Sequence, residues 1–121
     1  MRKRILLVDD TLTVTAVERL VLGPHYDYEE ARNGEEALQK AQTGRFDLIL
    51  LDLNMPIKNG VECLRGLKAA PATAGVPVVI VTTRGEEEAQ SLCRALGCAG
   101  FITKPLDRQA LQETVARLIG Q

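Results

Sequence analysis

The chain has 121 residues, of which 45% are hydrophobic and 26% charged, which is typical of one globular domain with a hydrophobic core. The 15 basic and 16 acidic side chains nearly cancel, and no basic stripe indicates direct binding to nucleic acid. No apolar run reaches membrane-spanning length, and residues 1–4 lead into a short strand-like segment rather than a signal peptide. We therefore expect a single domain over residues 1–121, cytoplasmic and without a membrane partner.

Five strand-like segments alternate with five helix-like segments. The strands are predicted at residues 4–9, 26–31, 46–52, 76–82 and 99–103. Apolar residues between them recur at helical spacing: Ala16, Val17, Leu20 and Val21; Ala37, Leu38 and Ala41; Val61, Leu64 and Leu67; Ala89, Leu92, Cys93 and Leu96; Leu111, Val115 and Leu118. Asn33 with Glu36 predicts a capping box, and the acidic run at 86–88 suits the positive end of a helix.

This alternation predicts an α/β fold, a doubly wound five-stranded parallel sheet with five helices on its two faces. The segments at 4–9, 46–52 and 76–82 are apolar in their middles, so we place them centrally. The segment at 26–31 alternates with charge and the one at 99–103 is short, so both suit edges. The order 2-1-3-4-5, adopted from known doubly wound sheets, fits these constraints and places a binding crevice at the carboxyl ends of the strands.

Polar side chains follow four of the predicted strands. Strand one ends in Asp9 and Asp10, strand three in Asp52, strand four in Thr82 and strand five before Lys104. Each alone could be a helix cap, a turn residue or a solvated side chain. In the predicted order they converge on one crevice, because neighbouring strands lie only about 4.8 Å apart.

The predicted crowding of carboxylates needs compensation. Two carboxylates roughly 5 Å apart repel by about 3 kcal/mol at an effective dielectric constant near 20. Three of them approach ~10 kcal/mol before screening, comparable to the whole stability of a small domain, roughly 5–15 kcal/mol. Protons, Lys104 or a divalent cation could offset this repulsion, and hard oxygen ligands suit Mg²⁺.

A metal-bound aspartate opposite a lysine is equipped to accept a phosphoryl group as an acyl phosphate. Asp52 is the best nucleophile candidate because it stands alone between the acidic pair and the Thr82–Lys104 side. The Thr82 hydroxyl can bond a phosphoryl oxygen, and a backbone carbonyl at Asn54 can complete the metal shell. In the loop that follows, we expect Pro56 and Gly60 to set the turns.

The segments ILLVDD, LILLDLNMPIKNG, VVIVTT and FITKP occur in this order, and essentially the whole chain resembles the receiver domain of two-component response regulators, the CheY-like family. The resemblance implies that Asp52 is the phosphoacceptor of a signalling protein rather than an enzyme, served by a sensor histidine kinase or a phosphotransfer protein. Asp10, Asp52 and the Asn54 carbonyl would bind Mg²⁺, with Asp9 acting through water, and Lys104 would pair with the phosphate.

The resemblance also implies a conformational switch. Thr82 would move to bond the phosphoryl group, Phe101 would turn inward, and the Lys104-Pro105 peptide would be cis. An output partner of unknown identity would bind the surface of the fourth helix, fifth strand and fifth helix, which would display residues such as Glu88, Arg94, Lys104 and Arg108. The protein would be a monomer or a phosphorylation-dependent dimer.

Two positions, Asn54 and Arg84, resemble family positions that tune dephosphorylation. We hypothesise that Arg84 shields the acyl phosphate from water, and a solvated arginine at a helix start is the equally open alternative.

Three other functions fit parts of the pattern. A haloacid dehalogenase-type phosphohydrolase needs Asp-x-Asp on its first strand, whereas Asp52 lies on the third. A flavin carrier would use the threonines at 11, 13 and 15 as a phosphate loop, but this loop lacks glycine. A receiver that serves as a protein-docking module, uncoupled from phosphorylation, stays open.

The histidine and cysteine content argues against three further kinds of site. The chain has one histidine, His25, and three cysteines without a CxxC pair, which is too few for a zinc site, a disulfide framework or a histidine triad.

Overall fold

The computed structural model describes residues 2–53, 59–83 and 85–120. Strands and helices alternate within them: β1 (Arg4–Val8), α1 (Leu12–Leu22), β2 (Asp27–Ala31), α2 (Gly34–Thr43), β3 (Leu48–Asp52), α3 (Gly60–Ala69), β4 (Val78–Thr82), α4 (Glu87–Ala95), β5 (Gly100–Thr103) and α5 (Arg108–Ile119). The strands form one parallel sheet in the order β2-β1-β3-β4-β5. The predicted fold, strand order and edge positions are confirmed.

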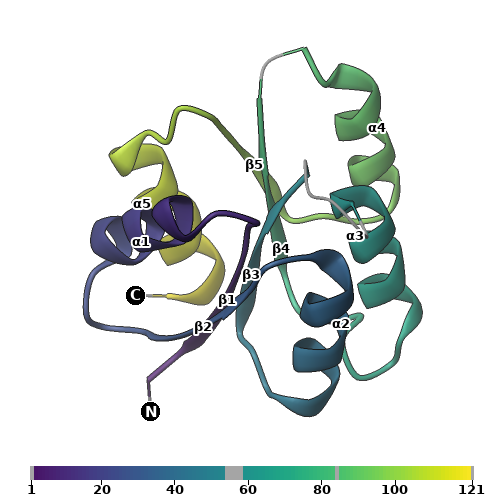
Figure 1. Cartoon of the computed structure of the whole chain (residues 1–121), viewed down its shortest axis with the longest axis horizontal. Coiled ribbons are helices and arrows are strands. Elements are labelled where there is room, and N and C mark those ends of the chain that lie inside the picture. Colours follow the sequence, from purple (N-terminus) through teal and green to yellow (C-terminus); the bar gives the residue numbers. More distant parts are fainter. Residues whose placement is uncertain (1, 54–58, 84, 121) are drawn as a thin grey trace.

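The sheet lies between two helical layers (Figure 1). Helices α1 and α5 cover one face, and α2, α3 and α4 cover the other. Side chains alternate between the layers along each central strand: Leu6 and Ile49 pack toward α2–α4, while Leu7 and Leu50 pack toward α1 and α5. Strands buried on both faces must be apolar throughout, which is why β3 has an almost uninterrupted aliphatic sequence before its last residue.

Two predicted strands begin two residues too early, and two others begin one residue too early. The structure begins β3 at Leu48 and β4 at Val78, two residues after the predicted starts. Phe46 and Val76 are apolar because they pack against the core on the α2–α4 side, not because they extend the sheet. The predicted strands were too long because apolar residues that are buried next to the sheet were counted as part of it.

Helix caps follow the sequence with one exception. The Asn33 side chain accepts a hydrogen bond from Glu36 N at 2.9 Å. Glu36 Oε1 accepts one from the backbone N of Arg32 at 2.6 Å, one residue before the cap residue Asn33, whose own N–H a regular capping box would use. Thr11, Asn59 and Asp107 cap α1, α3 and α5 in the same way. At α4, the residue in the cap position is Glu86, and its side chain makes no capping hydrogen bond.

Helix α1 buries a different face from the one its apolar residues suggest. Val17 and Leu20, which helped to predict the helix, are exposed, and Leu20 is 74% exposed. The buried residues are Thr15, Glu18, Val21 and Leu22. The prediction of a helix here is confirmed. The apolar pattern, however, does not identify which side of α1 faces the sheet.

In the part of the chain that the structure describes, no helix combines the length and apolar character needed to span a bilayer.

Candidate functional site

The carboxyl ends of four strands bring the predicted site residues together. Asp9 directly follows β1, Asp52 ends β3, Thr82 ends β4 and Lys104 directly follows β5. Because the strands are parallel, these ends lie along one edge of the sheet, with Asp52 opposite Val81 in the β3–β4 register. Among these side chains, the structure brings those of Asp9, Asp52 and Lys104 within ion-pair distance of one another.

Three carboxylates form the acidic part of the site. Asp9, Asp10 and Asp52 each offer an oxygen, and the three oxygens lie within 4.8 Å of one another. Asp9 and Asp52 are buried, whereas Asp10 is exposed. A cation bound here would therefore face solvent on the Asp10 side.

Asp9 has one satisfied oxygen and one unsatisfied oxygen. Its Oδ1 accepts hydrogen bonds from the backbone N of Thr11 at 2.9 Å and from the Thr11 hydroxyl at 3.0 Å. Its Oδ2 is buried and accepts no hydrogen bond from the described residues, although the Lys104 ammonium lies 3.6 Å away as an ion-pair partner. Buried acceptors of this kind are normally satisfied by an ordered water or an ion.

Lys104 supplies the positive charge opposite the cluster. Its Nζ lies 3.3 Å from Asp52 Oδ1 and 3.6 Å from Asp9 Oδ2, and its side chain is 27% exposed. Burial acts to lower the pKa of Lys104, but the neighbouring carboxylates of Asp52 and Asp9 outweigh it and the pKa is raised. The ammonium group therefore stays charged. Of the residues expected on the output surface, Lys104 is half-buried, whereas Glu88, Arg94 and Arg108 are exposed.

The residues present fit a magnesium ion. Three carboxylates and one ammonium sum formally to −3 + 1 = −2, which a divalent cation would balance. Oxygen ligands of octahedral Mg²⁺ lie roughly 3–4 Å apart, so oxygens within 4.8 Å of one another need little movement or one bridging water. The buried Asp9 Oδ2 accepts no hydrogen bond from the described residues, which is a further reason to expect an ion or its bound water here.

The two predicted switch residues both contact the α4 region. Thr82 is buried, and its hydroxyl lies 3.2 Å from Glu86 Oε1 and 3.3 Å from the carbonyl oxygen of Thr83. Phe101 is half-buried on β5, and the Arg94 guanidinium lies 4.8 Å from its ring centroid. The Lys104-Pro105 peptide bond is cis, as the resemblance implies.

Gly60 allows the start of α3 to pack closely against the end of β3. A Cβ at this position would lie 2.5 Å from the Leu53 Cα and 2.6 Å from the Asp52 carbonyl oxygen. Gly60 N also donates a hydrogen bond to Leu53 O at 3.0 Å. The start of α3 is thus held against the end of β3, as the predicted turn role of Gly60 requires.

Glu18 is a buried acidic residue that the sequence reasoning missed. It is 2% exposed on the inner face of α1, and its Oε1 has no hydrogen-bond partner among the described atoms. Burial is the main cause that raises the pKa of Glu18 to about 8, followed by the Asp9 carboxylate, with Lys104 acting in the opposite direction. A signal was present, because Glu18 lies three residues after Thr15 and three before Val21, along the buried stripe.

Asn54 and Arg84, together with Pro56, lie outside the described residues. Their predicted roles remain predictions.

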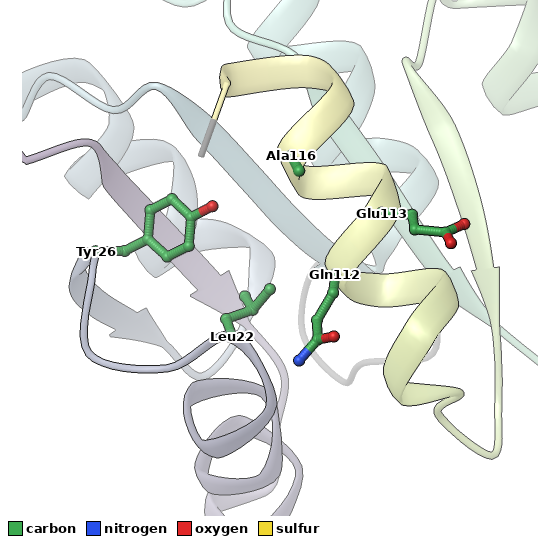
Figure 2. Close-up of a pocket in the computed structure, with 5 residues that line it drawn as sticks. All are labelled: Leu22, Tyr26, Gln112, Glu113 and Ala116. Atoms are coloured by element: carbon green, nitrogen blue, oxygen red, sulfur yellow. The ribbon is translucent and has the colours of Figure 1, made fainter.

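A cavity of about 350 Å³ lies between the end of α1 and α5 (Figure 2). It is lined by Leu22, Tyr26, Gln112, Glu113 and Ala116, and Gln112 Nε2 donates a hydrogen bond to Val21 O at 2.8 Å. None of the predicted site residues lines it, so this cavity is separate from the acidic site.

The structure is an α/β sheet with an acidic cluster facing a lysine at its carboxyl edge, and the comparisons identify the family of signalling domains to which it belongs. The family model of the response regulator receiver domain matches residues 5–116. The chain belongs to this family. Receiver domains are signalling domains rather than conventional enzymes, so the phosphohydrolase and flavin-carrier alternatives are set aside.

Individual relatives agree with this assignment. The chemotaxis protein CheY of Halobacterium salinarum is 30% identical, and the match covers 98% of each chain. The solved structure of the phosphorylated cyanobacterial phytochrome response regulator RcpA is 29% identical with a TM-score of 0.87, covering 98% of this chain and 94% of that one. A third relative, ycf29 of Porphyra purpurea, is 32% identical, and the match covers 94% of this chain but 54% of that protein. The chain thus spans about half the length of this relative.

Proposed function

We propose that this receiver domain accepts a phosphoryl group on Asp52 in a magnesium-dependent reaction, with a sensor histidine kinase or a phosphotransfer protein as the donor. The single observation that carries the proposal is the placement of Lys104 Nζ 3.3 Å from Asp52 Oδ1, beside a cluster of three carboxylates. Once a metal is bound by the cluster, the Asp52 carboxylate would have the metal ion on one side and the Lys104 ammonium on the other.

The chemistry follows from the donor groups. A carboxylate oxygen of Asp52 forms the new O–P bond, the P–N bond of a phosphohistidine breaks, and its electron pair stays with the imidazole nitrogen, which then takes a proton. Lys104 neutralises charge on the phosphoryl oxygens as they approach. Magnesium, when held by Asp9, Asp10 and Asp52, supplies further positive charge at the same oxygens.

The donor would dock on the exposed apolar surface of α1. Leu12 and Leu20 are 69% and 74% exposed, and Val17 lies between them. A cavity of about 250 Å³ beside this surface is lined in part by Val17, Pro105 and Lys104. An apolar helix face beside the acceptor suits a helix that carries the phosphodonor.

The switch would act through Thr82 and Phe101. The Thr82 hydroxyl would turn to the phosphoryl group, Phe101 would move inward, and the surface of α4, β5 and α5 would change its affinity for an output partner. The partner is not identified, and the active species would be a monomer or a phosphorylation-dependent dimer.

Intact-mass measurement tests the proposal. The wild-type protein, incubated with a small acyl or amido phosphate donor and Mg²⁺, should gain the mass of one phosphoryl group. Asp52→Ala should gain none, and chelation of Mg²⁺ should prevent labelling of the wild type. Absence of labelling in the wild type, together with intact folding, would favour the phosphorylation-uncoupled docking module instead.

A further inference from the structure

The side chain of Glu86 turns back toward the end of β4 rather than capping α4. Glutamate is not a favoured N-cap residue, and Glu86 makes no side-chain cap hydrogen bond. Its Oε1 instead accepts from the Thr82 hydroxyl at 3.2 Å, from the backbone N of Thr83 at 3.1 Å and from the Thr83 hydroxyl. A residue that breaks a local rule in this way is expected at a functional position.

The Thr82 hydroxyl cannot serve two acceptors at once. A hydroxyl carries one hydrogen, so a bond to Glu86 Oε1 excludes a bond from the same hydroxyl to a phosphoryl oxygen at Asp52. Thr83 holds Glu86 in place through both its backbone N and its hydroxyl. The hydrogen bond to a carboxylate is also stronger than one to a neutral acceptor such as the Thr83 carbonyl, which lies 3.3 Å away.

The same helix also contacts the second switch residue. Arg94, in the last turn of α4, stacks on the Phe101 ring at 4.8 Å from its centroid. Both switch residues are thus held by side chains of the α4 region in the unphosphorylated protein.

We infer that Glu86 is a positioning residue that withholds the Thr82 hydroxyl from Asp52, and so sets how readily the domain reacts and switches. The inference rests on the proposed function. When the phosphoryl group arrives, Thr82 exchanges the Glu86 carboxylate for a phosphoryl oxygen, and the two negative groups repel each other. Glu86 thereby favours the resting state and opposes switching without phosphorylation.

Labelling rates test the inference with graded variants. Glu86→Ala removes the acceptor and should be labelled about threefold to tenfold faster by a small phosphate donor with Mg²⁺, the population change expected from losing one ordinary hydrogen bond. Glu86→Gln keeps a weaker neutral acceptor and should fall between. The matched control is Glu87→Ala, because Glu87 is the next residue, is equally acidic and is exposed, and its rate should equal that of the wild type.

A second variant separates positioning from simple stabilisation. Thr83→Ala removes one of the donors that hold Glu86, so it should also accelerate labelling, and the double variant should be no faster than Glu86→Ala because both act through one oxygen. If Glu86 only stabilised the loop, its removal would lower the melting temperature without accelerating labelling.

The outcomes distinguish the two proposals. A wild-type protein that is labelled, with Glu86→Ala labelled at an equal or lower rate, overturns the inference and leaves the proposed function standing. A wild-type protein that is never labelled overturns the proposed function, and the inference fails with it. In the unlabelled protein, the NMR resonance of the Thr82 methyl group should shift in Glu86→Ala and not in Glu87→Ala, and an unchanged resonance would also overturn the inference.

Discussion

The ammonium group of Lys104 lies 3.3 Å from Oδ1 of Asp52, although the two residues are 52 positions apart in the chain. The same group lies 3.6 Å from Oδ2 of Asp9, so one cation faces two buried carboxylates from different strands. This ion pairing offsets part of the repulsion between the two buried carboxylates at the edge of the sheet. It also places the positive charge of Lys104 beside the oxygen to which a phosphoryl group on Asp52 would be attached.

Removal of the Lys104 charge should make the fold depend on magnesium. Breaking a partly buried ion pair leaves its partner uncompensated, so Lys104→Met should lose about 2 kcal/mol of unfolding free energy in metal-free buffer. Urea unfolding with and without Mg²⁺ measures this, and Mg²⁺ should stabilise the variant more than the wild type. Lys3→Met, a half-buried lysine outside the site, serves as the control. Equal stabilisation of both proteins by Mg²⁺ would contradict the prediction.

Glu18 should make stability fall as pH rises. The unfolded chain loses the Glu18 proton near its ordinary pKa of 4.5, whereas the folded protein keeps it until about pH 8, because the side chain is buried beside Asp9. The folded state therefore binds more protons across this window, and the unfolding free energy should fall by about 1.4 kcal/mol per pH unit relative to a non-titrating variant.

Glu18→Gln provides that variant. Both proteins are unfolded chemically at pH values from roughly 4 to roughly 9, a range that brackets the window in which Glu18 titrates. Because Asp9, Asp52, Lys104 and Glu30 are left intact in both, the comparison isolates the contribution of one carboxyl group. The curves of unfolding free energy against pH should diverge as the pH rises. Parallel curves would show that Glu18 ionises at its ordinary pKa.

Gly60 should tolerate no side chain. A Cβ would lie 2.5 Å from the Leu53 Cα, a contact with backbone that cannot move aside cheaply, so Gly60→Ala should lose about 2–3 kcal/mol of unfolding free energy. Phosphoryl labelling should fall as well, because the same contact shifts the end of β3. Gly75→Ala is the matched control, since nothing lies within 4 Å of its added Cβ. Equal loss in both variants would mean that the close packing at Gly60 does not matter.

Thr82→Ala should separate labelling from switching. The variant keeps Asp52, Lys104 and the acidic cluster, so it should still gain a phosphoryl group, within about tenfold of the wild-type rate. Without the hydroxyl, the ring of Phe101 should not change its environment on labelling. NMR of the Phe101 ring protons, before and after phosphorylation, measures this, and a full wild-type shift in the variant would contradict a role for Thr82 in switching.

Much of the fold follows from the sequence because burial on both faces of a parallel sheet demands unbroken apolar runs. The runs in β1, β3 and β4 fix the centre of the sheet, and the charged alternation in β2 fixes an edge. The site follows next, because parallel strands place their carboxyl ends at one edge. Asp9, Asp52 and Lys104 were predictable for this reason.

Side-chain contacts that depend on packing were not predictable in this way. Glu18 is buried although acidic, and Leu20 is exposed although apolar, so hydrophobic periodicity alone misassigns the inner face of α1. Glu86 was expected to favour the positive end of α4, but its side chain accepts hydrogen bonds from Thr82 and Thr83 at the end of β4. Local helix preferences say nothing about such contacts.

Site-resolved detection of the phosphoryl group tests the central claim most directly. After labelling with a small phosphate donor and Mg²⁺, borohydride reduces an aspartyl phosphate to an alcohol, and tryptic cleavage after Arg45 and Lys58 gives one peptide with two aspartates, Asp47 and Asp52. Fragment masses should place the reduced residue at Asp52, while Asp47, whose carboxylate accepts a hydrogen bond from Arg4 N at 2.8 Å, stays intact. Reduction at any other aspartate, or at none in a folded protein that contains Mg²⁺, would contradict Asp52 as the phosphoacceptor.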